Sequence, residues 1–355
     1  MDGHSYTGSK LHDMSDHTSE TRRTPDTQRP TLKTIARLTG LSVPTVSRAL
    51  SDAEDINADT KAKVRMAAKT VGYRPNRAGV RLRTGKTNVI SLVMATDHDM
   101  MNHTARLITS IAATLRDTPY HMIITPYDAG RDPMEPVRYI VETASADGLI
   151  LNQTTPQDPR VAYLMDRGFP FATHGRTSWS PSHPYFDFDN AAFARIVLDG
   201  LAARGRRSVL LVLPPPAQSY SRDMMQGARD ATRDHGLDCT VLQGATSDDP
   251  SEQIEAAVVA ALRAHPEIDA VLCGSTNACM AAATAVEALH RVVGADIDLA
   301  AKEAIPFLKR FRAGIFTVHE DVGRAGAFVA QATLARIADP EAPFMQHLDV
   351  PRALD

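Results

Sequence analysis

The chain has 355 residues, of which 43% are hydrophobic and 23% charged, and its formal net charge is −3. This length predicts two or three domains, each large enough to bury a core. The composition excludes collagen-like and wholly disordered chains, and no apolar run approaches the ~20 residues needed to cross a bilayer. We therefore expect a globular cytoplasmic protein with no membrane partner.

The N-terminal segment and the cysteines agree with that expectation. Residues 1–30 are polar, lack the apolar stretch of a secretory signal and show no helical or strand periodicity, so they predict a disordered tail. The three cysteines are an odd number and lie in apolar segments, at Cys239, Cys273 and Cys279. We interpret them as reduced core residues, not as disulfide partners or zinc ligands.

Charge is concentrated near one end of the chain. Residues 31–87 hold twelve basic and four acidic residues, a local net charge of +8, so the remainder carries −11. A basic block on an acidic body is typical of a module that binds a polyanion. A solvated charged face is the alternative, and charge alone does not decide between them.

The basic block has the pattern of short helices. Thr31 is a good N-cap for a first helix that Gly40 ends, and Ser42 caps a second helix with Pro44 in its first turn. A third helix is expected from about residue 58 to residue 71. Arg48 is expected on the outward face of the second helix, and an arginine there can pair with guanine in a major groove. The alternative is a small helical unit without a role in DNA binding.

This block resembles the DNA-binding headpiece of the lactose-repressor (LacI/GalR) family of bacterial transcription regulators. The resemblance rests on TLKTIARLTGLSVPTVSRAL at 31–50 and INADTKAKVRMAAKTVGYRPNRAGVRL at 56–82. It implies a helix-turn-helix headpiece at 31–75. It also implies a hinge helix or linker at 76–87 that folds on operator DNA.

The resemblance further implies roles for individual residues. Bases would be read by Val43, Pro44 and Arg48, and phosphates would be held by Thr31, Leu32, Ser42, Thr45, Ser47 and Thr60. In the hinge, the DNA contacts would come from Asn76, Arg77 and Leu82. Arg83 stands where family members often have a small residue, and its extra cation would add a phosphate or minor-groove contact. Leu82 matches the leucine that two subunits insert into the central minor-groove step.

After Thr87 the pattern changes to apolar runs that alternate with amphipathic helical segments. The runs lie at residues 88–95, 121–128, 146–153, 169–175, 208–215, 239–244, 268–275 and 297–301. Apolar strands followed by helices predict parallel sheets covered on both faces. Because this many runs exceed one sheet of ordinary size, we expect an α/β body of two doubly wound parallel-sheet lobes, with a ligand between them.

The body is also similar to the core of the same family, which shares the architecture of periplasmic sugar-binding proteins. The matching segments are ADGLIL (146–151), DFDNAAFARIVLDGLAARGRRSVLLV (187–212), VGADIDLA (293–300) and TVHEDVGRAGA (317–327). They imply an effector-binding and dimerisation core at 88–355. Its first lobe would be about 88–186 plus 319–340, and its second about 187–318 plus 341–355.

Polar residues at the ends of the predicted strands are candidates for effector contact, because a pocket needs a few convergent donors and acceptors. Others match pocket-facing positions of the family. The candidates are Asp97, His98, Asn102, His103, Gln153, His174, Arg176, Asp189, Arg195, Tyr220, Ser275, Thr276, Asn277, Lys302 and Glu303. Thr276 stands where many members have a sugar-binding carboxylate. No H-x-x-H or H-x-x-x-H pair is present, so no metal site is expected.

Together these features predict a sequence-specific, ligand-gated repressor of carbohydrate uptake or catabolism genes. It would be cytoplasmic and nucleoid-associated, binding a pseudo-palindromic double-stranded operator as a homodimer, with a small sugar-like effector. The alternatives are a regulator with a non-sugar or co-repressor ligand, and a sugar-binding protein without a DNA role. No G-x-S-x-G, Walker or G-x-G-x-x-G motif is present, so we expect neither catalytic residues nor a cofactor.

Overall fold

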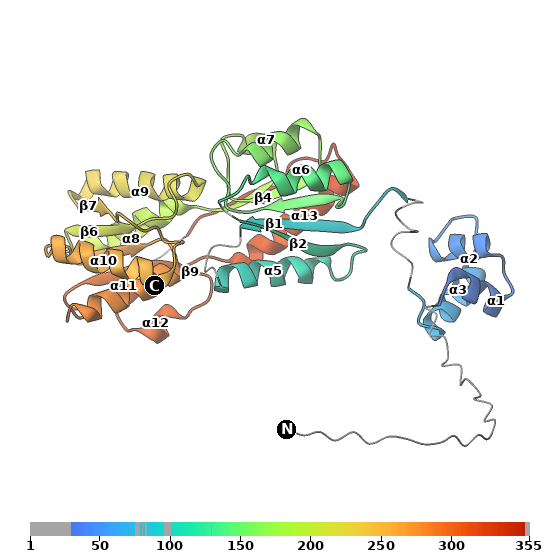
Figure 1. The fold of residues 1–355 in the computed structure, drawn as a ribbon, viewed down its shortest axis with the longest axis horizontal. Helices are drawn as coiled ribbons and strands as arrows, with labels where there is room; N and C mark the ends of the chain where they lie inside the picture. Colours follow the sequence, from blue (N-terminus) through green and yellow to red (C-terminus); the bar gives the residue numbers. More distant parts are fainter. Residues whose placement is uncertain are drawn as a thin grey trace, which may run out of the picture. The chain divides into compact units, whose positions relative to one another are not determined.

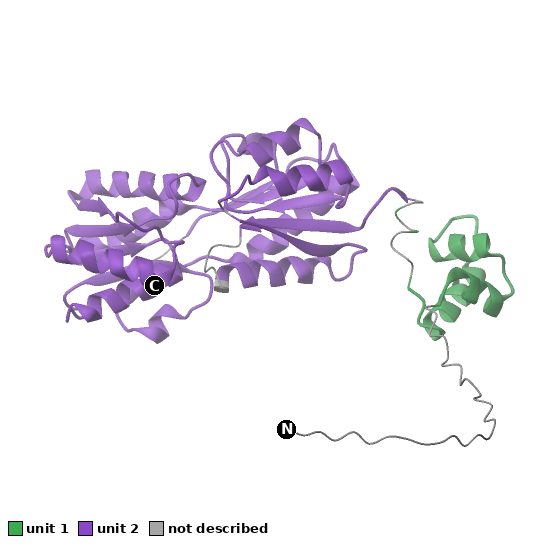
Figure 2. Ribbon diagram, in the orientation of Figure 1, with its two compact units in different colours: residues 1–83 green, residues 84–355 purple. Residues whose placement is uncertain are grey.

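The computed structural model describes residues 30–74, 79, 81, 84–95, 101–128 and 130–351. It divides the chain into two compact units, residues 1–83 and 84–355 (Figure 2). The predicted disordered tail up to residue 29 lies outside the described residues. So do six candidate site residues, namely Asn76, Arg77, Leu82, Arg83, Asp97 and His98.

The first unit contains the three helices that the sequence predicts. They are α1 (Leu32–Thr39), α2 (Val43–Leu50) and α3 (Ala58–Thr70), with N-caps at Thr31, Ser42 and Asn57. Gly40 ends α1 in the left-handed conformation, at φ 71°, which glycine adopts without steric cost. The helices pack around a small core of Ile35, Val46, Ala49, Val64 and Ala68.

The body begins with a six-stranded sheet, in the order β11-β5-β4-β3-β1-β2, in which every ladder is parallel. The strands are β1 (Val89–Ala95), β2 (His121–Tyr127), β3 (Gly148–Leu151), β4 (Phe171–His174), β5 (Tyr185–Phe188) and β11 (Gln346–Asp349). One face packs on α5 (Met101–Leu115) and α13 (Val322–Ala338), and the other on α6 (Met134–Thr143) and α7 (Pro159–Asp166). Figure 1 shows these layers.

A second, five-stranded parallel sheet forms the other lobe, in the order β10-β9-β8-β6-β7. Its strands are β6 (Ser208–Val212), β7 (Asp238–Val241), β8 (Ala270–Cys273), β9 (Asp298–Glu303) and β10 (Ile315–His319). Helices α8 (Asn190–Ala203) and α9 (Ser219–His235) cover one face. The other face packs on α10 (Ser251–Ala264), α11 (Thr276–Ala288) and α12 (Leu308–Phe311). The prediction of two doubly wound lobes is confirmed.

The C-terminal strand corrects one predicted boundary. The sequence assigns residues 341–355 to the second lobe, but β11 pairs with β5 at the edge of the first sheet, with Gln346 opposite Tyr185. The run QHLD carries little apolar signal, and an open sheet edge accepts a strand through its backbone groups. Among the described helices, none is both long and apolar enough to cross a membrane.

Candidate functional site

Helix α2 presents one polar face in the first unit. Val46 and Ala49 are fully buried, whereas Pro44 and Arg48 are exposed. Val43, Thr45 and Ser47 are half-buried beside them. The Ser42 hydroxyl accepts a hydrogen bond from the Thr45 amide at 3.3 Å and shares another with the Thr45 hydroxyl at 2.8 Å, which fixes the start of the helix.

Three cations of this unit, Arg48, Lys61 and Arg65, have acidic partners. Arg48, whose side chain is 58% exposed, forms an ion pair with Asp55. Lys61 and Arg65 lie 3.1 and 2.7 Å from the same carboxylate oxygen of Asp52. A nucleic acid that engages Arg48 therefore has to replace Asp55.

The remaining headpiece candidates lie at helix starts. Thr31 caps α1 and is exposed, and Leu32 is half-buried against the core. Thr60 is half-buried in the first turn of α3, where its amide donates to Asn57 Oδ1 at 2.7 Å. Helix N-termini with free amides are suited to phosphate contacts.

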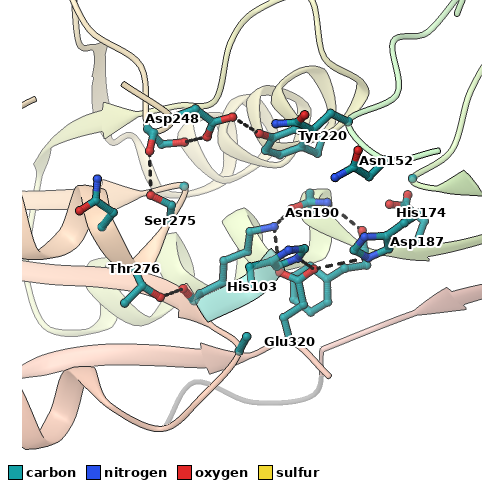
Figure 3. A pocket seen from close by; sticks show the side chains of 18 of the residues that line it. His103, Asn152, His174, Asp187, Asn190, Tyr220, Asp248, Ser275, Thr276 and Glu320 are labelled. Carbon is teal, nitrogen blue, oxygen red and sulfur yellow. Dashed lines mark hydrogen bonds and ion pairs between the residues drawn. The ribbon is translucent and has the colours of Figure 1, made fainter. Parts of the chain in front are cut away.

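In the second unit, a cavity of about 190 Å³ lies between the two lobes, at the carboxyl ends of the strands (Figure 3). Both lobes and the segments that cross between them contribute to its wall. The lining residues are His103, Asn152, Gln153, Thr154, His174, Gly175, Asp187, Phe188, Asn190, Tyr220, Ser247, Asp248, Gly274, Ser275, Thr276, Asn277, Met280, Lys302, Ala304 and Glu320.

A chain of hydrogen bonds holds the second-lobe wall. The Tyr220 hydroxyl donates to Asp248 Oδ2 at 2.6 Å, and the Ser247 hydroxyl donates to Asp248 Oδ1 at 2.9 Å. Ser275 donates to the Ser247 carbonyl at 2.8 Å and accepts from the Ala278 amide, so it also caps α11. Burial and the Asp248 carboxylate raise the pKa of Tyr220 well above its ordinary value, so this phenol stays protonated.

Lys302, from β9, lies at the centre of the cavity wall. Its ammonium donates to Asn190 Oδ1 at 2.9 Å and lies 3.0 Å from Glu320 Oε2. The ring centroids of Phe188 and Tyr220 each lie 5.3 Å from it, within the range of a cation–π contact. This side chain thus joins the second sheet to the crossing segments.

Two histidines and a carboxylate converge on the first-lobe side of the cavity. Glu320 Oε1 lies 3.4 Å from His103 Nε2 and 4.0 Å from His174 Nε2. The imidazole rings stack with their centroids 5.3 Å apart. Burial lowers the pKa of His174 to about 3, helped by its neighbour His103. Burial opposes ionisation of Glu320, but Lys302 and His103 outweigh it and hold its pKa well below the ordinary value.

A second ionic group lies beside the cavity. Arg176 Nε donates to Asp187 Oδ2 at 2.6 Å, and Arg176 Nη2 lies 3.4 Å from Asp223 in α9. Burial raises the pKa of Asp187 to about 6, although Arg176 lowers it in part. Because Arg176 follows β4 in the first lobe, its contact with Asp223 connects the two lobes.

Two family models match the chain. The model described as "Bacterial regulatory proteins, lacI family" matches residues 31–76, and "Periplasmic binding proteins and sugar binding domain of LacI family" matches residues 106–317. The second match alone covers more than half of the chain. The chain belongs to the LacI family. The resemblance noted in the sequence is thereby confirmed for both units.

Curated relatives of this LacI-family protein are transcriptional regulators. The HTH-type transcriptional regulator AglR of Rhizobium meliloti (strain 1021) is 30% identical over 315 residues, covering 86% of this chain and 87% of AglR. The HTH-type transcriptional regulator RafR of Escherichia coli is 35% identical over 209 residues, covering 58% of this chain and 62% of RafR.

Solved structures show the same fold. A structure titled "transcriptional regulator CelR-cellobiose complex" superposes with a TM-score of 0.67 at 22% identity, covering 92% of this chain and 98% of that one. A lac repressor dimer bound to operator and the anti-inducer ONPF superposes with a TM-score of 0.78 at 17% identity, with the same coverage. At these identities the likeness supports the architecture of this LacI-family chain.

Eight of the sequence-predicted effector residues line the cavity of this LacI-family protein. They are His103, Gln153, His174, Tyr220, Ser275, Thr276, Asn277 and Lys302. Ser275 and Asn277, at the start of α11, use polar groups in local hydrogen bonds. Ser275 donates to the Ser247 carbonyl, and Asn277 Oδ1 accepts from the Ser251 hydroxyl at 2.8 Å. Asn102 lies in α5, but its side chain is outside the described part of the structure.

Four predicted effector residues do not line the cavity. Arg195 forms ion pairs with Asp199 and Asp234 on the surface of α8. The Glu303 carboxylate is buried and accepts the amides of Phe307 and Leu308, both at 2.9 Å. The other two have structural contacts as well, Asp189 as the N-cap of α8 and Arg176 in the ionic group described above.

The structure adds polar residues that the sequence reasoning missed. They are Asn152, Asp187, Asn190, Asp248 and Glu320. Two of them, Asp187 and Asn190, belong to the DFDN run, and Glu320 belongs to the TVHED run, both of which carried the family resemblance. Their place directly at the lobe crossings was the signal that could have identified them.

Proposed function

We propose that this LacI-family protein is a transcriptional repressor that releases operator DNA when a small carbohydrate binds between its lobes. The observation that carries the proposal is the presence, in one chain, of a helix-turn-helix unit and a polar interlobe cavity. A binding event at one site then biases binding at the other, which is a coupling free energy of about 1–3 kcal/mol.

The headpiece supports DNA binding through charge and exposure. The local net charge of +8 attracts the phosphate backbone, while the rest of the chain at −11 is repelled by it. Val43, Pro44 and Arg48 of α2 would read bases. Contacts to phosphates would come from Thr31, Leu32, Ser42, Thr45, Ser47 and Thr60. The hinge residues Asn76, Arg77, Leu82 and Arg83 remain part of this proposal.

The cavity favours a polyhydroxy ligand. The Asn152 Oδ1 atom is buried and has no hydrogen-bond partner among the described residues, and the Asp187 carboxylate faces the same space. Such acceptors suit sugar hydroxyls, and the rings of Phe188 and Tyr220 offer apolar faces. The similar CelR structure is a complex with cellobiose, which points to the same ligand class.

The assembly follows from the DNA. A pseudo-palindromic operator presents two half-sites, which a two-fold homodimer matches with two headpieces. The lac repressor structure is itself a dimer bound to operator. We therefore propose a cytoplasmic homodimer that regulates carbohydrate uptake or catabolism genes by binding and not by catalysis.

The test is selection of duplexes from a random pool with the full chain, followed by fluorescence anisotropy on the enriched sequence. A palindromic motif is expected. Arg48→Met should weaken binding by about 1–3 kcal/mol and relax one position of the motif, since it removes a base-reading group. Arg48→Lys keeps the charge but loses bidentate geometry, so it should relax the same position with a smaller loss of affinity.

Lys69→Met is the matched control, because Lys69 is an exposed cation of α3 outside the predicted base contacts. It should change affinity equally for all sequences. A panel of mono- and disaccharides is then added to the preformed complex, and one should lower the anisotropy. Enrichment of no motif contradicts the DNA-binding proposal, and a ligand that strengthens the complex identifies a co-repressor instead.

A further inference from the structure

One cluster on the cavity wall consists of three side chains that commonly bind metal ions in proteins. His103 comes from the first turn of α5, His174 ends β4, and Glu320 follows β10. One potential ligand atom from each lies within 4.8 Å of the other two. In Figure 3 the three side chains point toward one another at one side of the cavity.

The donor set is that of a transition-metal site. Two imidazole nitrogens and one carboxylate oxygen bind Zn²⁺ and its first-row neighbours, and leave a position open for another ligand. Bonds of about 2.0–2.1 Å in tetrahedral geometry separate the ligand atoms by about 3.3 Å. The Glu320–His103 distance of 3.4 Å already matches this spacing, and the Glu320–His174 distance of 4.0 Å is close.

The hydrogen-bond partners leave the cluster incomplete. Lys302 neutralises Glu320 through Oε2, so Oε1 is the atom that both imidazoles share. The 4.0 Å separation of Glu320 Oε1 from His174 Nε2 is too long for a hydrogen bond, so this pair is close without being bonded. His103 Nδ1 is also buried with no hydrogen-bond partner among the described residues, whereas Nε2 of the same ring bonds Glu320 Oε1 at 3.4 Å.

Burial strengthens the attraction between the Glu320 carboxylate and a cation bound in the cluster. The side chains of His174 and Glu320 are only 9% and 6% exposed. A buried carboxylate interacts strongly with a nearby cation because little water screens it. The same three residues line the cavity, so an open coordination position would face the bound ligand.

We propose that His103, His174 and Glu320 form a divalent transition-metal site of the zinc class on the wall of the interlobe cavity. The metal would tie the first lobe to the segment that crosses between β10 and α13. Its open position would accept an oxygen of the ligand in the cavity. The absence of a short histidine pair from the sequence does not argue against this site, because its ligands lie on three separate elements.

The test uses the full chain, stripped with a chelator and titrated with Co²⁺ while visible absorption is recorded. Elemental analysis after gel filtration gives the stoichiometry, and Zn²⁺ competition gives the affinity. One tight site per chain is expected. His174→Gln and Glu320→Gln should each weaken Co²⁺ binding by more than about 100-fold, which exceeds the roughly 10–100-fold effect of losing an outer contact.

His265→Gln is the matched control, because His265 is exposed in the second lobe and pairs with Glu267. It should leave the tight site unchanged and thereby separate it from adventitious binding by other histidines. Lys302→Met should bind Co²⁺ more tightly, since it removes a positive charge 3.0 Å from the proposed carboxylate ligand. A general disruption of the cavity would lower the affinity for Co²⁺, so a higher affinity in this variant cannot result from such disruption.

If the two glutamine variants fail to fold, X-ray absorption of Co²⁺-loaded wild-type protein decides the matter. Two imidazoles and an oxygen ligand support the site. Absence of a tight site in the wild type, or equal binding by wild type and the folded variants, overturns it and leaves a histidine–carboxylate hydrogen-bond cluster only. No DNA or sugar is used, so either result is independent of the proposed repressor function.

Discussion

Asp187 shows how burial and pairing compete at a single residue. The residue is 6% exposed and its carboxylate lies against Arg176, with Asp223 and Lys302 as the other charged groups that act on it. Burial dominates, and the pKa rises from 3.8 to about 6. The folded protein therefore holds a proton on this group that the unfolded chain releases.

That difference predicts a pH dependence of stability. Between pH 4 and 6 the folded state binds more protons at Asp187 than the unfolded state does. The contribution of this residue is thus fully present below pH 4 and is lost as pH rises to 6, with a slope of up to about 1.4 kcal/mol per pH unit. Urea unfolding of wild type and Asp187→Asn across pH 4–7 measures it, and a constant difference between the two proteins contradicts the assignment.

Single residues were predicted best where a strand end fixes them. His174 ends one buried strand and Ser275 follows another, and parallel strands bring their carboxyl ends to one edge. Arg195 does not line the cavity, because the rotation of α8 directs it toward Asp234 of α9, and the sequence pattern does not fix that rotation. Glu320 was missed because its place depends on how the chain crosses from the second sheet to α13.

Helices α8 and α9 pack closely at one glycine. A Cβ on Gly227 would lie 2.1 Å from the carbonyl oxygen of Ala191, which is backbone and cannot rotate away. Both helices cover the same face of the second sheet, over a core that includes Phe193 and Met224. The close spacing between these two helices therefore requires a residue without a Cβ at position 227.

Gly227→Ala should accordingly destabilise the second lobe. Overpacking of a tight core contact costs about 1–3 kcal/mol, and it outweighs the gain in helix propensity of roughly 1 kcal/mol. Gln226→Ala is the control, because Gln226 is exposed on the same helix. Thermal unfolding should show a lowered midpoint for the glycine variant alone, and equal midpoints for both would show that α8 shifts without cost.

The elements themselves were largely predictable, with one informative exception. Runs such as SVLLV and AVLC became fully buried strands because both faces of each parallel sheet are covered by helices. Strand β11 lacks this signature, since QHLD is partly exposed at a sheet edge. Its position is set by backbone pairing with β5, which leaves no mark in the hydrophobic pattern.

At the scale of the second unit, the described residues include two contacts that connect the lobes beside the cavity. The Ser219 amide donates to the Thr154 carbonyl at 2.8 Å, and Arg176 reaches Asp223 at 3.4 Å. Both join the first sheet's loops to α9. They favour the arrangement in which the cavity is enclosed.

Asp223→Ala should shift the lobes toward a more open arrangement. Arg176 keeps Asp187 as a partner, so the substitution removes an interlobe contact without leaving a bare buried charge. A half-buried ion pair contributes about 1 kcal/mol, roughly fivefold in the open-to-closed ratio. Small-angle scattering should give a larger radius of gyration than wild type.

Asp230→Ala is the control on the same helix, because Asp230 contacts only Gln226 and Arg233 within the second lobe among the bonds described. Its scattering curve should match that of the wild type. Identical curves for wild type, control and Asp223→Ala would show that the Arg176 contact does not hold the lobes together.

The hydrogen-bond chain from Tyr220 through Asp248 and Ser247 to Ser275 has a consequence for the order of events. That wall is preorganised, since its polar groups are already oriented by one another. On the opposite wall, the Asn152 Oδ1 acceptor has no hydrogen-bond partner among the residues that the structure describes. A ligand therefore binds to the second lobe without a large loss of side-chain conformational entropy there. The Asn152 acceptor of the first lobe gains a hydrogen-bond donor only when the ligand is bound. The second-lobe wall therefore binds the ligand first, and the first-lobe wall closes on it afterwards.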